Sequence, residues 1–217
     1  GIDAAIQIVG VDTAESRRDE ALRLGLADAA YATIGEAVAA EHPDAALVCT
    51  APLAHAAVIG ELLDHDLPVF TELNLVSDSY RENMAKAAAK KLPLFLSSTM
   101  LYRRETQYIK QQVAEFGKPV HYIYKAVRSF ECFGDGIHLF WEGNPKALYE
   151  FKDGDKRFVN TYASFEHDSR YSDNVVENAY VDELTNFFGV LKGDEQPKWS
   201  FEKDLKAIEL MDRIEKA

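Results

Sequence analysis

The sequence predicts an α/β protein in which a parallel, doubly wound sheet is followed by a smaller α+β part. In the first half, short apolar runs alternate with helical segments that are apolar on one side. From about residue 120 onward, aromatic and apolar residues alternate with period two between glycine-containing turns, which is typical of antiparallel strands. The 217 residues suffice for two small domains, and we expect a boundary near Lys118, with domains 1–118 and 119–217.

The clearest unit of the first half lies between Pro43 and Leu75. Its expected elements are a buried strand, Ala45–Cys49, a helix, Leu53–Leu63, and a second buried strand, Pro68–Phe70. Both strands end in small or polar residues. Because ligands of open parallel sheets bind beyond the carboxyl ends of the strands, we expect a ligand site there.

The rest of the first half follows the same alternation. A strand, Ala4–Val11, precedes a helix that runs from about Thr13, its expected N-cap, to Leu24, with Gly25 just beyond its end. Thr33 and Glu36 form a capping box that starts another helix. The remaining expected elements are a helix Ser77–Lys91, a strand Leu92–Leu96 and a helix Arg103–Phe116.

The second half combines strands with two long helices. Gly143-Asn144 and Asp153-Gly154 supply turns between strands, and Gly193 ends a helix. The expected strands are Val120–Arg128, Ile137–Trp141, Ala147–Phe151 and Phe158–Phe165, and the expected helices are Asn174–Leu191 and Ser200–Glu215.

Charge and composition exclude several classes of partner. The formal net charge of −12 argues against nucleic acid and anionic membrane surfaces, which both require a basic face. No apolar run approaches the ~20 residues that span a bilayer, so we expect no membrane association. Cys49 and Cys132 are interpreted as two reduced thiols of a cytoplasmic protein. No Cys/His cluster has zinc-ligand spacing, so no metal site is expected.

Asp12 is the first candidate for cofactor binding, together with its neighbour Thr13. An acidic residue at the end of such a strand hydrogen-bonds the adenosine ribose hydroxyls of a dinucleotide. Its negative charge would repel the additional phosphate of NADP, which favours NAD as the cofactor. The alternative is that Asp12 only caps the helix that follows.

Further candidates follow the strands of the central unit. Thr50, Ala51 and Pro52 are small enough to let a flat cofactor approach the backbone, and His55 lies one turn into the next helix. The alternative for His55 is a capping or surface histidine. Glu72 and Asn74, which follow the second strand of the unit, complete the set of candidate residues. The alternative for Glu72 is that its carboxylate faces the N-terminus of a helix.

Taken together, these motifs resemble the glucose–fructose oxidoreductase / inositol dehydrogenase / MocA (Gfo/Idh/MocA) family. V-D-T-A-E-S-R-R-D-E-A is similar to the family's second strand and helix, and P-D-A-A-L-V-C-T-A-P-L-A-H resembles its D-x-V-x-I-x-T-P-x-x-x-H signature. P-V-F-T-E-L-N-L stands where the family has H-V-x-x-E-K-P-L, and L-F-L-S-S-T-M-L-Y-R-R matches its last Rossmann strand. The closing segment V-D-E-L-T-N-F-F-G-V-L-K-G-D-E-Q-P is similar as well.

The resemblance implies a Rossmann domain that binds NAD(P) and a second domain with an open antiparallel sheet. It implies hydride transfer between the nicotinamide and a hydroxyl or carbonyl carbon of a sugar, a cyclitol or a related small molecule. In that family the second-domain sheets commonly form oligomer contacts, so we expect a homo-oligomer. Asp12 would hold the adenosine ribose, and Glu72 and Asn74 would lie near the nicotinamide ribose.

Three departures from the family pattern stand against a direct transfer of function. The opening strand and its glycine-rich phosphate loop have no counterpart, Leu73 replaces the lysine of the E-K-P motif, and the Asp/His helix expected near residues 128–131 is not visible. Two explanations stay open: the sequence joins ordered pieces of a longer protein, or it is a shortened, inactive relative. No catalytic base is therefore assigned, and the alternative function is a catalytically silent nucleotide- or sugar-binding protein that acts as a sensor or assembly module.

Overall fold

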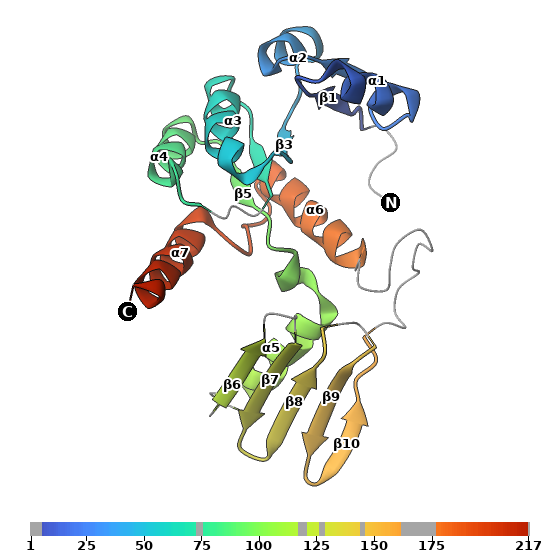
Figure 1. Cartoon of the computed structure of the whole chain (residues 1–217), viewed down its shortest axis with the longest axis vertical. Helices are drawn as coiled ribbons and strands as arrows, with labels where there is room; N and C mark the ends of the chain where they lie inside the picture. The colour runs from blue at the N-terminus through green and yellow to red at the C-terminus, as the bar shows by residue number, and fades with distance from the viewer. Residues whose placement is uncertain are drawn as a thin grey trace. The chain divides into compact units, whose positions relative to one another are not determined.

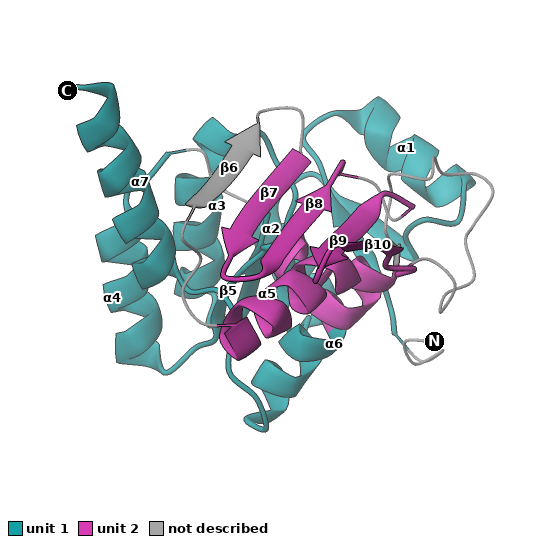
Figure 2. Ribbon diagram, turned by 90° about the horizontal axis from the view of Figure 1, so that it is seen from below, with its two compact units in different colours: residues 1–98, 185–217 teal, residues 99–184 magenta. Residues whose placement is uncertain are grey.

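The computed structural model of the chain describes residues 6–72, 76–116, 121–125, 129–143, 146–161 and 177–216. The chain forms two compact units: the first unit consists of residues 1–98 and 185–217, and the second unit consists of residues 99–184 (Figure 2). The boundary expected near Lys118 differs from this division. Helix α5 (Arg104–Phe116) contacts strand β8 (Ile137–Trp141) of the second unit, and the last helix belongs to the first unit.

The first unit contains the expected parallel strands, which confirms the α/β class. They form two sheets rather than one: β1 pairs with β2, and β4 pairs with β3 on one side and β5 on the other, all in parallel (Figure 1). The short strand β2 was not predicted, because its alanines resemble helix more than strand. The strands are β1 (Val9–Val11), β2 (Ala29–Tyr31), β3 (Ala46–Val48), β4 (Val69–Thr71) and β5 (Leu94–Leu96).

Local signals explain where the helices of the first unit begin and end. The capping box at Thr33 is confirmed, since its side chain accepts from the Glu36 N–H and the Glu36 carboxylate reaches back to the Thr33 N–H. Gly25 adopts a φ of 66° just past α1, where glycine is favoured. These helices are α1 (Glu15–Arg23), α2 (Ile34–Glu41), α3 (Pro52–Asp64), α4 (Tyr80–Lys90), α7 (Phe201–Glu215) and the carboxyl-terminal part of α6 (Glu177–Lys192).

Two cap predictions were wrong in detail. The N-cap of α1 is Ala14, which has no capping side chain, and Thr13 lies one residue earlier. The N-cap of α4 is Ser79 rather than Ser77, and its side chain makes no capping bond. Ser200, in contrast, accepts from the Lys203 N–H as expected, so α7 starts at its predicted cap.

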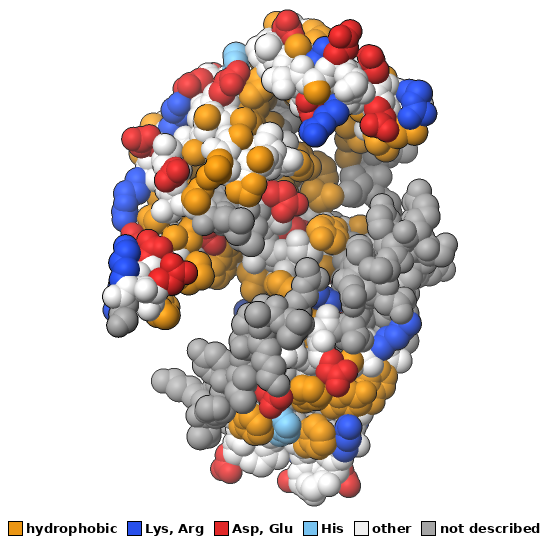
Figure 3. Space-filling model, in the orientation of Figure 1, with side chains coloured by type: hydrophobic (Ala, Val, Ile, Leu, Met, Phe, Trp, Pro, Cys, Tyr) orange, Lys and Arg blue, Asp and Glu red, His pale blue; other side chains and the backbone are white. Residues whose placement is uncertain are grey.

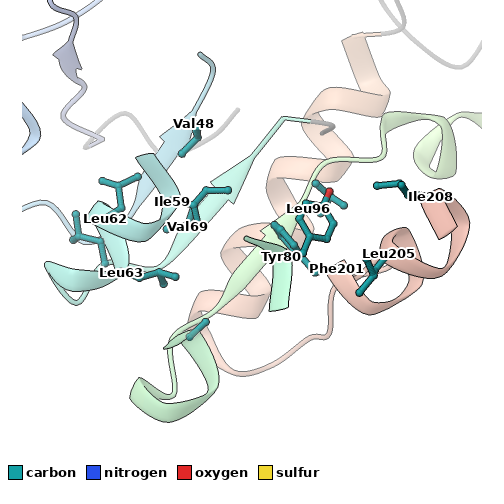
Figure 4. Packing of buried hydrophobic residues seen from close by; sticks show 12 residues of the cluster. Val48, Ile59, Leu62, Leu63, Val69, Tyr80, Leu96, Phe201, Leu205 and Ile208 are labelled. Carbon is teal, nitrogen blue, oxygen red and sulfur yellow. The ribbon is translucent and has the colours of Figure 1, made fainter. Parts of the chain in front are cut away.

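The core of the first unit joins the three-stranded sheet to the helices around it (Figure 4). Strand residues Val48, Val69 and Leu96 pack with apolar side chains of α3, and with Tyr80 of α4 and residues of α7. Residues of α2 pack against the same cluster, and α2 also contacts β1 and β2. The C-terminal helix therefore completes a core that begins more than 100 residues earlier in the chain.

The second unit is built on one antiparallel sheet of five strands in the order β10-β9-β8-β7-β6 (Figure 1). Tight turns connect its hairpins, at Asp135-Gly136 and at Asp153-Gly154, where positive φ angles suit glycine. Strand β7 was not predicted, and the last strand is shorter and earlier than the expected Phe158–Phe165, part of which lies outside the described residues. The strands not yet delimited are β6 (His121–Lys125), β7 (Ser129–Gly134), β9 (Leu148–Lys152) and β10 (Asp155–Phe158).

Helix α5 covers one face of this sheet. Ile109 packs with Cys132, Leu139, Trp141 and Leu148, all of which are buried. The alternate positions of the strands point to the opposite face, which no described helix of the second unit covers (Figure 1). The sheet thus has one face in a core and one face of aromatic residues, where the Lys156 ammonium lies 4.3 Å from the centroid of the Tyr149 ring.

Two general expectations can be compared with the described part of the chain. Cys49 and Cys132 are both free thiols, as expected. Among the described helices, none has the length and apolar character needed to cross a membrane. Within the same residues, no cluster of three or more His, Cys, Asp or Glu side chains is arranged to hold a metal ion.

Candidate cofactor site

The carboxyl ends of β3, β4 and β5 lie at the same edge of one sheet. Val48 is the partner of Thr71, and Thr71 is the partner of Leu96, so the residues that follow these three lie side by side. The backbone bonds from the Glu72 N–H to the Val48 carbonyl (3.1 Å) and from the Ser97 N–H to the Thr71 carbonyl (2.8 Å) extend this register. The structure therefore brings the segments around Thr50, Glu72 and Ser97 together, as the sequence predicts.

The turn after β3 is formed by small residues. Thr50 and Ala51 are exposed, and Pro52 occupies the first turn of α3, where its missing N–H costs no hydrogen bond. The His55 side chain is only 2% exposed, and its Nε2 lies 2.8 Å from the Thr50 carbonyl oxygen. His55 is thus a buried residue that holds the turn in place, not the surface histidine of the alternative.

Glu72 and Cys49 form the exposed part of this edge. Burial, followed by the nearby Glu72 carboxylate, raises the pKa of the Cys49 thiol, which keeps the thiol protonated at neutral pH. Cys49 was expected inside a core strand, but it lies one residue past β3 and is exposed. Asn74, the last residue of the predicted set, and Leu73 lie outside the described residues.

Asp12 lies just beyond β1, and groups of this chain already contact its carboxylate. Its Oδ1 accepts from the Ala14 N–H at 2.8 Å, and its Oδ2 lies 3.4 Å from an Nη of Arg17. Arg18 donates to the main-chain carbonyls of Asp12 (2.7 Å) and Thr13 (3.1 Å). The hydrogen bond from Ala14 lowers the pKa of the Asp12 carboxyl, with a smaller contribution from Arg17, so this carboxyl is ionised at neutral pH.

The alternative for Asp12, a cap of the helix that follows, is not met in that form, because the N-cap of α1 is Ala14 and no side chain caps the helix. The Asp12 carboxylate instead accepts the Ala14 N–H and closes the turn before the helix. A hydrogen bond from the adenosine ribose of a cofactor to the Asp12 carboxylate stays a prediction, because this side chain is still 33% exposed. The two arginines after Asp12 were not assigned a role from the sequence. The E-S-R-R segment carries the sequence signal for this contact. Its two arginines stand five and six residues after Asp12, so their long side chains can reach back to Asp12 across the first helical turn.

Two arginines lie at the start of the second unit, Arg103 just before α5 and Arg104 at the first residue of α5. Arg103 is buried, its Nε lies 3.5 Å from a carboxylate oxygen of the buried Glu105, and its guanidinium lies over the Trp141 ring. Arg104 is half-exposed and lies 3.6 Å from Asp182. Arg103 is thus part of the interior of the second unit.

His138 is a strand residue, as predicted, on the uncovered face of the sheet. Its ring is stacked between Phe133, at 4.2 Å between centroids, and Phe151, at 5.0 Å. Its Nε2 lies 3.8 Å from a Glu131 carboxylate oxygen. His138 therefore belongs to an aromatic row and not to the strand ends of the first unit.

The residues at the strand ends fit two parts of a nicotinamide dinucleotide. Carboxylates such as those of Asp12 and Glu72 can accept hydrogen bonds from ribose hydroxyls, and the small residues after β3 leave room for a flat ring. The described residues contain no glycine-rich turn at a helix N-terminus that would receive the pyrophosphate. The described residues thus fit the riboses and the flat ring of the cofactor, and they include no binding turn for its pyrophosphate.

The parallel strands of the first unit and the antiparallel sheet of the second unit, covered on one face by α5, define an α/β protein with a Rossmann-like part and an open-sheet part. Sequence comparison does not place the chain further, because no family model and no curated protein matches it.

Solved structures, in contrast, share its fold. An oxidoreductase from Agrobacterium radiobacter, in complex with NAD+, L-tartaric acid and magnesium, is similar with a TM-score of 0.76 and 11% identity, over 94% of this chain and 86% of that one. A UDP-N-acetylglucosamine 3-dehydrogenase from Acidithiobacillus ferrooxidans gives a TM-score of 0.69 at 12% identity, over 92% and 87%. A Gfo/Idh/MocA family oxidoreductase from Vibrio cholerae gives 0.70 at 10% identity, over 95% and 88%. The chain therefore has the fold of the family that its motifs resemble.

Proposed function

We propose that the chain is an NAD(P)-dependent oxidoreductase that transfers a hydride to or from a hydroxyl or carbonyl carbon of a sugar, a cyclitol or a related small molecule. The observation that carries this proposal is the shared edge of β3, β4 and β5, where Thr50 and Glu72 follow adjacent strands. The fold shared with oxidoreductases supports it, since one of them is in complex with NAD+ and another is a UDP-N-acetylglucosamine 3-dehydrogenase.

The proposed roles follow from position. Thr50, Ala51 and Pro52 would line the cofactor, with His55 holding their turn, while Glu72 and Asn74 would lie near the nicotinamide ribose and Asp12 near the adenosine ribose. The bound nicotinamide supplies the redox chemistry, and the strand ends orient it. The role of acid or base is left unassigned, since Leu73 cannot exchange a proton.

The test is a titration of NAD(P)H against the purified chain, followed by incubation with candidate keto sugars. Nicotinamide fluorescence reports binding, and loss of absorbance at 340 nm reports turnover. Binding with turnover is the expected result. Binding without turnover would favour the second candidate, a catalytically silent binding protein, for which Leu73 in place of the family's lysine is the specific observation. Absence of NAD(P)H binding would contradict the oxidoreductase and the nucleotide-binding form of the silent protein.

A homo-oligomer formed through the second unit is part of this proposal. The uncovered sheet face carries a continuous group of aromatic rings, and Figure 3 shows hydrophobic side chains gathered over this sheet. Uncovered apolar patches of this kind mark interaction surfaces. The aromatic face consists of Phe133, His138, Phe140, Tyr149, Phe151 and Phe158.

Light scattering tests the oligomer directly. Replacing Phe140, near the middle of the aromatic face, with aspartate should convert the assembly to monomer, because a charge on each copy would be desolvated at the contact. Asp135→Lys in the β7–β8 turn is the matched control, since it changes charge at the tip of the sheet and should leave the mass unchanged. A monomeric parent chain at all concentrations would rule the proposal out.

A further inference from the structure

Two charged residues lie at the ends of the aromatic face, and they bear on how two copies of the chain meet there, so the inference rests on the homo-oligomer of the proposed function. Lys156 of β10 is the partner of Phe151, and Glu131 of β7 is the partner of Phe140. Directly opposite residues of an antiparallel pair project from the same side of the sheet. Both charges therefore share the side of the aromatic rings.

The pairing register arranges this side of the sheet in two rows that cross β10, β9, β8 and β7. One row consists of Lys156, Phe151, His138 and Phe133, and the other consists of Phe158, Tyr149, Phe140 and Glu131. The cation stands at the β10 end of the first row, and the anion stands at the β7 end of the second row. Opposite charges thus occupy opposite ends of one apolar surface.

The two charges are too far apart to pair within one chain. Strands β9 and β8 lie between β10 and β7, which puts Lys156 and Glu131 about 14 Å apart across the sheet at the usual strand spacing. The Lys156 ammonium lies 4.3 Å from the centroid of the Tyr149 ring and 5.4 Å from that of the Phe151 ring. Glu131 is only 20% exposed and lies beside His138, whose Nε2 is 3.8 Å from a carboxylate oxygen. A partner that covers the aromatic face would remove water from both charges.

These charges limit how a second copy can cover the face. A charge that loses its water at a contact costs free energy unless an opposite charge meets it. A two-fold axis that runs roughly along the strands, between β8 and β9, lays β10 of each copy over β7 of the other, because residues exchange roles across such an axis. A two-fold axis across the strands lays β10 over β10 and brings like charges together. Both axes allow two sheets to pack in alignment about 10 Å apart, so the charges decide between them.

We propose that the chain forms a two-fold dimer in which Lys156 of each copy pairs with Glu131 of the partner subunit across the packed aromatic faces. The rings supply the apolar contact, and the two symmetric ion pairs fix the axis. A surface that carries only one of the two charges does not complete both pairs. The face therefore selects a second copy of this chain.

Charge reversal at either position tests the pairing. Lys156→Glu sets a carboxylate against Glu131 of the partner subunit, and Glu131→Lys sets an ammonium against Lys156 of the partner subunit. Each change should raise the dissociation constant of the dimer at least about tenfold at low salt and by less at high salt, because like charges then meet. The chain with both changes regains opposite charges and should return to within about threefold of the parent. Sedimentation velocity measures these constants.

A mixture of the two single variants gives the sharpest result. The Lys156→Glu chain carries a carboxylate at both positions and the Glu131→Lys chain carries an ammonium at both, so each should pair with the other and not with itself. Native mass spectrometry, with a tag on one variant, identifies the heterodimer. Lys152→Glu is the matched control, because Lys152 is the partner of Ile137 and lies over the Phe116 ring on the face that α5 covers. It should leave the dissociation constant unchanged.

Circular dichroism establishes that each variant is folded. Lys156 is exposed, so its replacements carry the test if Glu131→Lys does not fold: the dimer should weaken from the parent to Lys156→Gln and further to Lys156→Glu. Equal dissociation constants in Lys156→Glu and Lys152→Glu would overturn the inference and leave the proposed oligomer intact. Two folded, monomeric single variants that form no heterodimer would do the same. A parent chain that is monomeric at all concentrations would end both the proposed oligomer and this inference.

Discussion

At the residue scale, Asp204 is a buried carboxylate whose two hydrogen-bond donors come from separate parts of the first unit. Its carboxylate accepts from the Tyr80 hydroxyl at 2.7 Å and from the Trp199 Nε1 at 3.0 Å, which joins α7 to α4 and to the segment before α7. No sequence motif predicts this contact, because Tyr80 and Asp204 are 124 positions apart. The tertiary structure therefore distinguishes Asp204, which stabilises the core, from Asp12 and Glu72, which lie at the ends of strands.

Replacing Asp204 with alanine should lower the free energy of unfolding by about 1–3 kcal/mol, because the buried Tyr80 hydroxyl and the half-buried Trp199 N–H both lose this acceptor. Urea denaturation followed by tryptophan fluorescence measures the change. Glu202→Ala, on the exposed side of the same first turn of α7, is the control and should change stability by less than about 0.5 kcal/mol. Equal effects of both changes would contradict the structural role of Asp204.

Tyr108 offers a prediction that depends on pH. Burial, and then the Glu150 carboxylate that accepts a hydrogen bond from the Tyr108 hydroxyl at 2.6 Å, raise the pKa of Tyr108 to about 12. The ordinary pKa of tyrosine is about 10, so the folded state holds this proton more tightly than the unfolded state. The stabilisation is therefore fully present below about pH 10 and is lost as the pH rises toward 12.

Ultraviolet difference titration at 295 nm, comparing the chain with Tyr108→Phe, should show one phenol that ionises near pH 12. In Tyr108→Phe, the free energy of unfolding should depend less on pH between 10 and 12 than it does in the parent chain. Tyr180→Phe, on an exposed position of α6, is the control and should leave this feature unchanged. A difference spectrum that titrates near pH 10 would contradict the contact with Glu150.

At the scale of elements, periodicity and caps located most helices and strands to within a few residues. Helix α3 extends one residue beyond the predicted Leu53–Leu63 at each end, and α5 and β8 agree closely with their predicted ranges. The strands β2 and β7 were not predicted, because the three residues of β2, two of them alanines, are too few to show a period, and because β7 mixes polar, apolar and glycine residues. The unpredicted elements are thus those whose strand character comes from pairing with a neighbour.

Helix α3 permits a matched test of its packing. Leu63 is fully buried in the core cluster, whereas Leu53, on the same helix, is 82% exposed. Leu63→Ala should lower the free energy of unfolding by about 2–5 kcal/mol, because it leaves a cavity. Leu53→Ala should change it by less than about 0.5 kcal/mol, since no packed contact is lost. Thermal or urea unfolding measures both, and similar losses in the two variants would contradict the packing of α3.

At the scale of the whole molecule, the parallel strands of the first unit are divided between two sheets. One sheet is the pair β1-β2, and the other is the triplet β3-β4-β5. In a doubly wound sheet with the strand order 3-2-1-4-5-6, a pair and a triplet of neighbouring strands are separated by strand 1. Strands β1 and β3 each present one unpaired edge at this break, and Val11 and Leu47 are exposed there. Apolar parallel strands are normally buried on both faces, so these two edges are the least protected part of the sheet.

Hydrogen exchange can test the break residue by residue. In a parallel pair, alternate residues of a strand bond to the partner, so the amides of Val9, Val11 and Leu47 point away from β2 and β4. They should exchange at least about tenfold faster than those of Val48 and Phe70, which point into their ladder. Equal protection of all five amides would show that both edges are covered.

The sequence by itself determined the alternation of strands and helices, the turn glycines, the capping box at Thr33 and the polar strand ends of the candidate site. These features depend on residues close together in the chain, where propensity and periodicity act. The tertiary structure alone decided that the last helix returns to the first unit, that His55 is buried, that Asp12 is engaged by Arg17 and Ala14, and that the parallel strands form two sheets. Pairing and burial depend on which segments meet in space, and local patterns do not encode those meetings.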